Sequence, residues 1–332
     1  MDELERRIRA ARPMSGHRDL PLTSRAKQEL ADLVLSRPNA TLSRARAASR
    51  QHDRRRMTRR LVAASTGIAM VAAATAVVLN ILVPSGSAQA VTPAPLVTTA
   101  IGESTTETLE GLEMVKQADD AAPQHTVRLQ SWELHTEIGD EGSIVSSSVE
   151  PHWSETTFAD DGSVRILLTA ADPFPGQDAE GLPTPGTVLA DETLEPGEYV
   201  STYDEAVPTD PAEIDAYLAQ YAGEESPLTA GAAIREISGL LSSIIVTTEQ
   251  ETAIIAYLQT LDGLTVAGTV IDRLGREGIA FSAADRRPGE YQDYLILSPD
   301  TGSIIAAETV YIGSERTDIT SPSVIDYVAW ER

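Results

Sequence analysis

The spacing of apolar residues predicts extended structure where the second third of the chain begins. From residue 125, apolar residues recur at every second position, as at Val127 and Leu129. This period is typical of a β-strand with one buried face. The stretch that follows contains a hairpin whose turn is residues 160–163, where Gly162 accepts the positive φ of such turns. We therefore expect two early strands in this part of the chain.

Helical spacing replaces this alternation further along. A stretch rich in proline and glycine, residues 171–199, is predicted to be a long loop. Helices are expected over residues 105–122, 210–223, 227–245 and 248–263. Asp210 as N-cap followed by Pro211 begins the second of these helices, and Thr248 is expected to cap the last.

The last 70 or so residues return to short apolar stretches separated by turn residues. They predict strands over residues 264–271, 278–283, 291–297, 304–312 and 324–330. Early strands, then helices, then a run of strands is the order of an α+β fold. We expect helices packed on one face of an antiparallel sheet.

An apolar segment, residues 61–83, has 23 residues without a charge. At about 1.5 Å per residue, a helix of this length spans the hydrocarbon core of a bilayer. Pro84 then stops it. A cleaved signal peptide would have a shorter apolar region and a shorter leader, so we expect an uncleaved transmembrane helix. Cleavage after Ala90 stays open.

Basic residues set the expected orientation of this helix. Five arginines stand at its amino-terminal edge: Arg54, Arg55, Arg56, Arg59 and Arg60. Beyond the other edge there is no Lys or Arg before Lys116. The positive-inside rule therefore places the amino-terminal arm in the cytoplasm and the carboxy-terminal domain outside the cell membrane.

Four regions follow from this pattern. They are a cytoplasmic basic helical arm (1–60), a transmembrane helix (61–83), a linker or stalk (84–104) and an extracytoplasmic α+β domain (105–332). The arm holds 16 basic and 7 acidic residues, whereas the whole chain has a net charge of −24. The acidic outer part argues against nucleic-acid binding. The basic arm either meets anionic lipid or only sets topology, and we favour topology.

The arm carries one apolar stripe that includes Leu30, Leu33 and Val34. Their spacing places them on one face of a helix that is otherwise polar. A single stripe cannot make a core, so these residues are candidates for binding a partner, the membrane surface or a second copy.

Motifs of catalysis are absent from the sequence. The chain has no cysteine, and no Gly-x-Ser-x-Gly, His-Glu-x-x-His or phosphate-binding loop. The best constellation is Glu133, His135 and Glu137, which alternate along one strand, with His152 as a fourth member. A metal would accept these groups, but a solvated strand face has the same composition, and we favour the solvated face. We therefore expect no catalytic, metal-binding or cofactor-binding residues.

Aromatic residues supply the candidates for an apolar pocket. They are Trp132, Trp153, Tyr291 and Tyr294. Core or sheet-edge packing is the commoner role of such residues.

Several segments carry a resemblance to a known family. They include "MDELERRIRAARP" at the start, "EPHWSETTFADDGS", "TTEQETAIIAYLQTLDGLTVAGTVIDRLGREGIAF" and "YLILSPDTGSIIAAETV". With them the chain resembles an uncharacterised family of actinobacterial single-pass membrane proteins whose layout is that of anti-sigma factors. The closing strands are similar, more distantly, to the half-barrels of envelope lipid- or lipoprotein-binding proteins, including the regulator of the envelope-stress anti-sigma factor. The chain lacks the cysteines of zinc-type anti-sigma domains.

Two hypotheses about function follow. In the first, the outer domain is a non-enzymatic sensing or ligand-binding domain, and the resemblance implies that residues 1–60 contact a sigma factor. In the second, the protein is an envelope carrier or structural protein that binds an apolar ligand, without cytoplasmic signalling. A hydrolase ranks third because no nucleophile–base pair is visible in the sequence.

Overall fold

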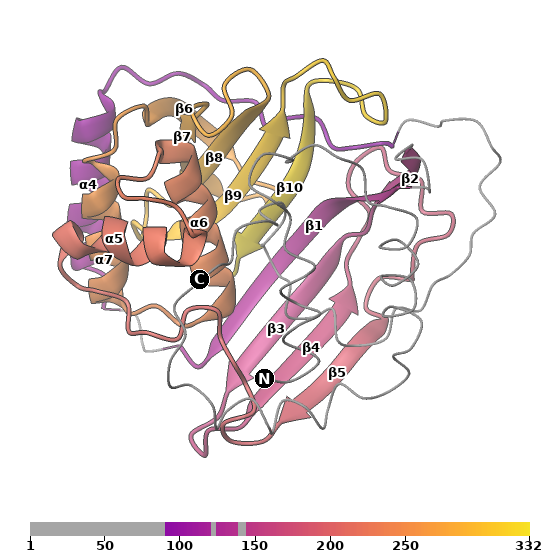
Figure 1. Cartoon of the computed structure of the whole chain (residues 1–332), viewed down its shortest axis with the longest axis horizontal. Coiled ribbons are helices and arrows are strands. Elements are labelled where there is room, and N and C mark those ends of the chain that lie inside the picture. The colour runs from indigo at the N-terminus through magenta and orange to yellow at the C-terminus, as the bar shows by residue number, and fades with distance from the viewer. Residues whose placement is uncertain (1–89, 121–123, 139–143) are drawn as a thin grey trace, which may run out of the picture. The chain divides into compact units, whose positions relative to one another are not determined.

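The computed structural model describes residues 90–120, 124–138 and 144–332 (Figure 1). The predicted arm, its Leu30, Leu33 and Val34 stripe, the five arginines and the apolar segment 61–83 lie outside the described residues. Within the described ranges, no helix has both the length and the apolar character needed to cross a bilayer.

One large antiparallel sheet organises the described residues. Its strands are β1 (Thr126–Ile138), β2 (Ile144–Val149), β3 (His152–Phe158), β4 (Val164–Ala170), β5 (Val188–Leu194), β6 (Thr265–Ile271), β7 (Glu277–Ala283), β8 (Tyr291–Leu297), β9 (Ile304–Tyr311) and β10 (Ser323–Trp330). They lie in the order β5-β4-β3-β1-β10-β9-β8-β7-β6, and β2 pairs with the far end of β1. The last strand therefore lies beside the first, at the middle of the sheet.

Four helices belong to the described residues, and local sequence accounts for where they begin. They are α4 (Thr105–Gln117), α5 (Pro211–Ala222), α6 (Ala230–Ser243) and α7 (Thr248–Leu258). Ser104 caps α4 in a capping box with Glu107, and Asp210 caps α5. These side chains satisfy backbone N–H groups that the first helical turn leaves unpaired. Gly223 ends α5 in the left-handed conformation that glycine favours.

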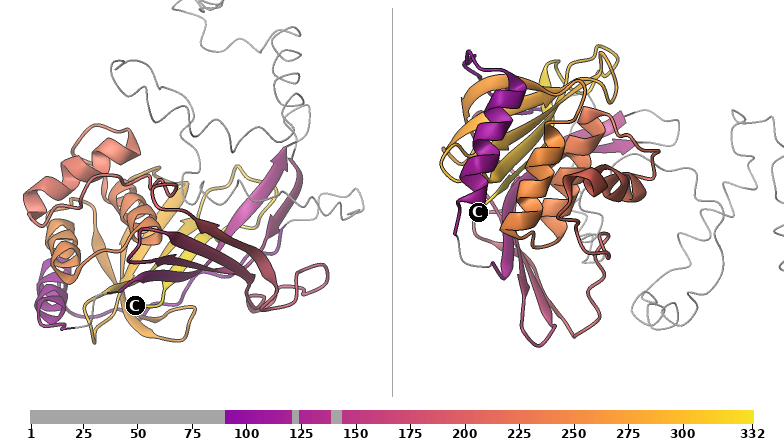
Figure 2. Two further views of the ribbon diagram at one scale, coloured as in Figure 1. Left: turned by 90° about the horizontal axis from the view of Figure 1, so that it is seen from below. Right: turned by 90° about the vertical axis from the view of Figure 1, so that its left-hand side faces the viewer.

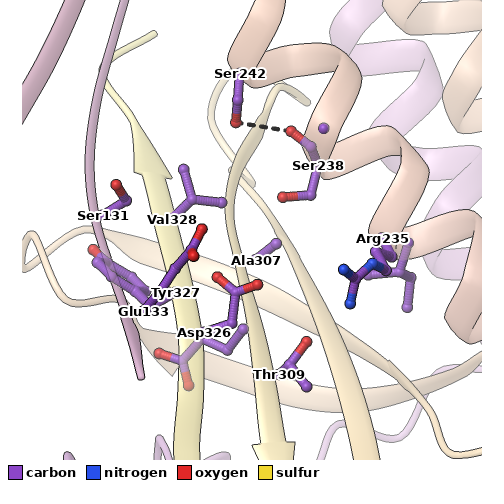
Figure 3. Close-up of a pocket in the computed structure, with 13 residues that line it drawn as sticks. Ser131, Glu133, Arg235, Ser238, Ser242, Ala307, Thr309, Asp326, Tyr327 and Val328 are labelled. Atoms are coloured by element: carbon purple, nitrogen blue, oxygen red, sulfur yellow. Dashed lines mark hydrogen bonds between the residues drawn. The ribbon is translucent and has the colours of Figure 1, made fainter. Parts of the chain in front are cut away.

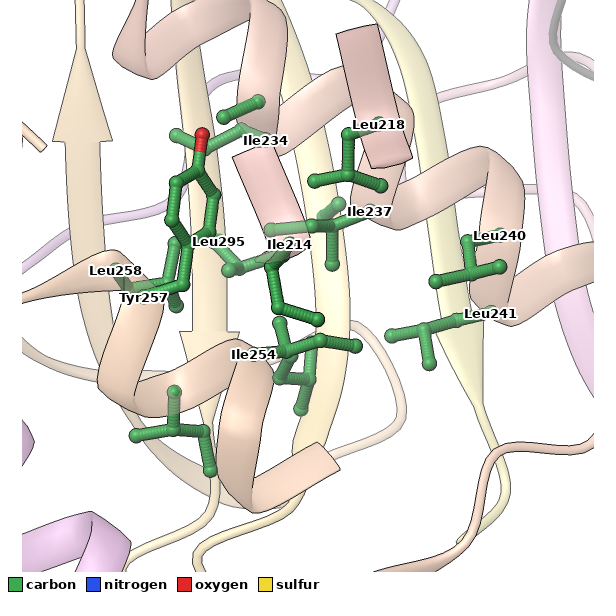
Figure 4. Packing of buried hydrophobic residues seen from close by; sticks show 14 of the residues in the cluster. Ile214, Leu218, Ile234, Ile237, Leu240, Leu241, Ile254, Tyr257, Leu258 and Leu295 are labelled. Carbon is green, nitrogen blue, oxygen red and sulfur yellow. The ribbon is translucent and has the colours of Figure 1, made fainter. Parts of the chain in front are cut away.

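The helices gather over the β6–β10 half of the sheet, and β3, β4 and β5 extend beyond them (Figures 1 and 2). We call the side of the sheet that faces α6, with Leu129, Ala307 and Val328, the front face. Apolar residues of α5, α6 and α7 pack together and against this face to form the larger core (Figure 4). Ile214, Ile237 and Ile254 are completely buried in it.

The opposite side, the back face, has a core of its own. Trp132, Ile296 and Tyr327 are buried there. Residues 90–99 follow this face: the Ala90 N–H donates to the Asp318 carbonyl, and Thr99 bridges to Thr269 on the edge strand β6. Both faces of the sheet centre are therefore covered.

The predicted α+β class, the antiparallel sheet and the helices are confirmed. The prediction of a long loop over residues 171–199 is wrong in part, because Val188–Leu194 forms the edge strand β5. The prediction of two early strands is also wrong, since five strands precede α5. The cap of α7 is Thr247 in place of Thr248, with Gln250 completing its capping box.

Candidate functional site

A cleft opens between α6 and the centre of the sheet (Figure 3). It encloses about 550 Å³, counting the part that is open to solvent. Strands β1, β9 and β10 form its floor, and one side of α6 forms its wall. Its polar lining residues are Ser131, Glu133, Arg235, Ser238, Ser242, Glu308, Thr309, Asp326 and Tyr327.

The amino terminus of α6 is fixed to the sheet, and this attachment sets the wall of the cleft. The Asp285 carboxylate accepts hydrogen bonds from the N–H groups of Ala230 and Gly231, at 3.0 and 2.8 Å. Gly231 allows a close approach, because a Cβ atom there would lie 2.8 Å from Asp293 Oδ2. Residues three or four positions apart share one side of a helix, so the stripe that begins at Gly231 continues through Arg235 and Ser238 into the cleft.

The floor of the cleft carries a row of polar residues across four strands. Glu133 on β1 lies directly opposite Asp326 on β10. Asp326 lies opposite Thr309 on β9, and Thr309 lies opposite Asp293 on β8. Opposed residues on neighbouring strands have side chains on the same face, about 4.5–5.5 Å apart at Cβ. Three carboxylates and a hydroxyl therefore line up beneath α6.

One of these carboxylates is neutralised by the protein. Asp293, which is 1% exposed, accepts two hydrogen bonds from the Arg286 guanidinium, at 2.9 and 2.8 Å. The Thr309 hydroxyl donates to the same carboxylate at 2.8 Å. These contacts satisfy the buried carboxylate, so the Arg286 guanidinium and the Thr309 hydroxyl are already engaged by Asp293.

Glu133 and Asp326 on the floor of the cleft, and Arg235 on α6, have no such ion-pair partner among the described residues. Within the part of the chain that the structure describes, Glu133 makes neither a hydrogen bond nor an ion pair, and Arg235 makes neither. Asp326 likewise makes no ion pair with a described residue. The guanidinium of Arg235 extends toward the floor of the cleft (Figure 3). Unpaired charged groups that converge on a cleft are typical of a binding site.

Burial and mutual repulsion raise the pKa values of the two acids. Burial, followed by the charge of Asp326, raises the pKa of Glu133 to about 7, and Arg235 opposes this shift. Burial also raises the pKa of Asp326 above its ordinary value; Arg235 is the largest opposing influence, and Asp293 adds to the rise. Near pH 7 the pair therefore carries fewer than two negative charges.

A serine and a histidine meet beside the cleft. The Ser131 hydroxyl and His152 Nε2 are 3.0 Å apart, across β1 and β3. Burial lowers the pKa of His152, which favours the neutral ring. His152 Nδ1 lies 3.4 Å from the Glu150 carbonyl oxygen, so a backbone group takes the place of the carboxylate that orients the histidine of a catalytic triad. Ser131 is only 1% exposed. The contact therefore gives the buried Ser131 hydroxyl a hydrogen-bond partner. The sequence alone did not reveal this pairing of a serine with a histidine.

Comparison with known proteins gives distant structural likenesses. No protein-family model matches the chain, and no curated protein matches it. The match to the crystal structure of MucB covers 68% of this chain and 57% of the MucB chain, at 13% identity and a TM-score of 0.27. The Pseudomonas aeruginosa MucA/MucB complex covers 68% and 54%, at 13% identity and a TM-score of 0.26. A putative outer membrane lipoprotein-sorting protein domain from Vibrio parahaemolyticus covers 69% and 92%, at 9% identity and a TM-score of 0.20.

These likenesses agree in kind with the distant resemblance to envelope half-barrels, but they are weak. The match spans little more than half the length of the MucB chains. At such TM-scores the likenesses carry no argument about activity or partners. The candidate site therefore stands on its own geometry.

The aromatic pocket candidates are spread over the sheet. Trp132 is buried on the back face against Phe174 and Tyr327. Trp153 is half-buried on β3, beneath the guanidinium of Arg128.

The two tyrosine candidates lie on β8. Tyr291 packs against Tyr311 and beneath the guanidinium of Arg286. Tyr294 lines a smaller back-face space of about 220 Å³, together with Leu96 and Glu308.

The constellation of Glu133, His135 and His152 is partly brought together. Glu133 lines the cleft and His152 borders it through Ser131, whereas His135 is exposed. The side chain of Glu137 lies outside the described ones. No group of three or more His, Asp or Glu side chains in the described ranges is arranged to hold a metal ion.

Sequence reasoning missed Asp326 and Arg235. Asp326 interrupts the otherwise largely apolar strand "SVIDYVAW", and Asp293 interrupts "YQDYLIL" in the same way. A charge inside a central strand is costly, so its presence is a signal that a functional or paired site lies there. Arg235 is a lone basic residue in an apolar helix, "AGAAIREISGLLSS". Only the fold shows that these residues share one cleft.

Replacing Glu133 with glutamine is expected to stabilise the protein at high pH. The folded-state pKa of about 7 lies above the ordinary value of 4.5. The folded state therefore keeps a proton that the unfolded state has lost, and stability falls as pH rises between these two values. Glutamine does not titrate at this position. The free energy of unfolding of the variant, relative to that of the natural protein, should therefore rise by about 2 kcal/mol from about pH 5 to pH 8.

Urea unfolding at a series of pH values measures this difference. The charged groups that face Glu133 are Asp326 on β10 and Arg235 on α6, and both remain in the variant. Replacing the exposed Glu192 of β5 with glutamine is the control, because it removes a surface carboxylate that does not line the cleft. An advantage of the Glu133→Gln variant that is the same at every pH would contradict the prediction.

Proposed function

We propose that this protein is a non-enzymatic binding protein whose α+β domain takes a small polar ligand in the cleft beneath α6. One observation carries the proposal. Glu133, Asp326 and Arg235 face the same open cleft from the two sides of it, and none forms an ion pair with another described residue. Charges that are partly removed from water are costly unless a partner compensates them, and a ligand can be that partner.

A location in the cell for this domain is also part of the proposal. We propose that residues 61–83 anchor the protein in the cell membrane, that residues 1–60 are cytoplasmic, and that the described domain is extracytoplasmic. Ligand binding outside would then be the signal, and the basic arm would contact a sigma factor inside. The apolar stripe of that arm supports the presence of a partner.

An envelope carrier of an apolar ligand is the second candidate. The feature that favours it is the part of the front face that extends beyond the helices, where Ile166 and Leu168 of β4 are only half-buried. The charged lining of the cleft favours the first candidate, because a purely apolar ligand would leave Glu133 and Arg235 without partners.

Thermal unfolding tests the cleft as a binding site. The full chain is heated with and without a small-molecule extract of the cells that produce it. A ligand at about 100 times its Kd contributes about 2.7 kcal/mol, which corresponds to a rise in Tm of about 5–10 °C for a domain of this size. Filling the cleft by Ser238→Trp should abolish the rise, because Ser238 lines the wall.

The matched control places the same bulk elsewhere. Gln220 is exposed on α5, and Gln220→Trp should keep the full rise in Tm. The proposal fails if the extract does not shift the Tm of the natural protein, or if Ser238→Trp responds as strongly as Gln220→Trp.

A further inference from the structure

The two sides of the cleft have opposite charge. The floor carries Glu133 and Asp326, which lie directly opposite each other on neighbouring strands. The wall carries Arg235, from the helix that covers them. In Figure 3 the three side chains surround the same open space. The cleft is therefore anionic on its sheet side and cationic on its helix side.

Among the residues that the structure describes, neither side of the cleft has an ion-pair partner in direct contact. The other guanidinium close to the row belongs to Arg286, and Asp293 occupies it with two hydrogen bonds. No described carboxylate forms an ion pair with Arg235. A ligand with only a positive group would leave Arg235 unmatched, and a ligand with only a negative group would add a third anion near two carboxylates.

A hydroxyl donor stands beside Arg235. Ser238 follows it by three residues on the same side of α6, and its side chain makes no hydrogen bond with the described residues. The neighbouring hydroxyls are already used: Ser131 meets His152, and Ser242 donates to the Ser238 carbonyl and accepts from Trp330 Nε1. Arg235 and Ser238 together therefore present unused donors, which is the arrangement that binds a carboxylate or phosphate.

We propose that the ligand of this cleft is a small zwitterion, with its ammonium group between Glu133 and Asp326 and its carboxylate or phosphate on Arg235 and Ser238. The inference rests on the proposed function, because it names the ligand class of that binding site. The cleft, of about 550 Å³ including the part that is open to solvent, has room for a small molecule.

Calorimetry with matched probes tests this class. The probes for the full chain are linear ω-amino acids of increasing length, with the n-alkylamine and the n-alkanoate of equal length as single-charge controls. The best ω-amino acid should bind about ten- to a hundredfold more tightly than either control, because it alone forms charge-assisted hydrogen bonds on both sides. O-Phosphoethanolamine extends the test to phosphate as the anionic group.

Two variants separate the two halves of the site. Arg235→Gln should weaken binding of the ω-amino acid to the level of the alkylamine, and it should not weaken binding of the alkylamine itself. Arg235→Lys should restore part of the loss, which shows that charge is responsible. The double variant Glu133→Gln with Asp326→Asn should remove alkylamine binding. An alkylamine that binds as tightly as the ω-amino acid would overturn the assignment of Arg235.

Two further outcomes separate this inference from the proposed function. If the cell extract raises the Tm and ω-amino acids and O-phosphoethanolamine do not compete with it, the zwitterion class is wrong and the binding site stands. If the extract has no effect either, both fail. Retention of the protein by vesicles that display phosphoethanolamine headgroups, reversed by free O-phosphoethanolamine, would identify a lipid headgroup as the source. Binding of the free compound alone would identify a soluble zwitterion.

Discussion

Replacing Glu251 with alanine is expected to lower the free energy of unfolding by about 3–5 kcal/mol. The Glu251 carboxylate is 1% exposed and joins three distant parts of the chain. It lies 3.1 Å from Lys116 Nζ on α4 and 3.0 Å from the Arg332 guanidinium at the carboxy terminus. It also accepts from the Ile304 N–H at 2.8 Å. Its removal leaves a buried ammonium group and a buried N–H without this acceptor.

Guanidinium chloride unfolding measures this loss, and two further variants identify its cause. Glu249→Ala removes an exposed acid from the first turn of the same helix, and should cost only about 0.3–1 kcal/mol. Glu251→Leu combined with Lys116→Met removes both buried charges, and should be more stable than Glu251→Ala alone. A double variant that is less stable than Glu251→Ala would show that the cost is not that of an unpaired charge.

Replacing Trp132 with alanine is expected to cost about 3–5 kcal/mol of unfolding free energy. Trp132 is 2% exposed, and its ring lies 5.1 Å from that of Tyr327 and 5.9 Å from that of Phe174. Truncation would open a cavity in the back-face core, where close packing leaves little room to relax. Thermal and denaturant unfolding of the full chain measure the loss.

Trp153 supplies the matched control. It lies one strand away on β3, is half-buried, and packs mainly beneath the guanidinium of Arg128 at 4.6 Å. Trp153→Ala is expected to cost less than about 1.5 kcal/mol, because an exposed cation–π contact contributes about 0.5–1 kcal/mol beside a modest loss of buried area. Equal losses from the two variants would contradict the assignment of Trp132 to the core.

The elements that depend on local signals were predictable from the sequence. Asp210 with Pro211 marks the start of α5, and Gly223 marks its end, because capping and the left-handed conformation act within a few residues. The closing strands from β6 to β10 follow their apolar stretches closely for the same reason. Turn residues separate them, and each stretch is long enough for one strand.

Features that depend on distant partners were not predictable. Val188–Leu194 is a largely exposed edge strand that pairs with β4. Its alternation of apolar and polar residues is weak, so the proline and glycine residues on both sides of it led to the prediction of a loop. Glu251 has the position of an N-terminal helix acid, yet it serves as a buried link to Arg332. The cleft was not predictable for the same reason. Glu133 and Asp326 are far apart in sequence, and only the pairing of β1 with β10 makes them neighbours.

The central place of β10 has a consequence for synthesis. Leu129 pairs with Trp330, so the strand that joins the two halves of the sheet is made after every other described strand. Until residues 323–330 have been made, the strand groups β5-β4-β3-β1 and β9-β8-β7-β6 have no strand between them. Pairing across some 200 residues of sequence is slow. Glu133 and Asp326 therefore become neighbours, and the cleft gains its complete floor, only after β10 has been made and has paired with β1.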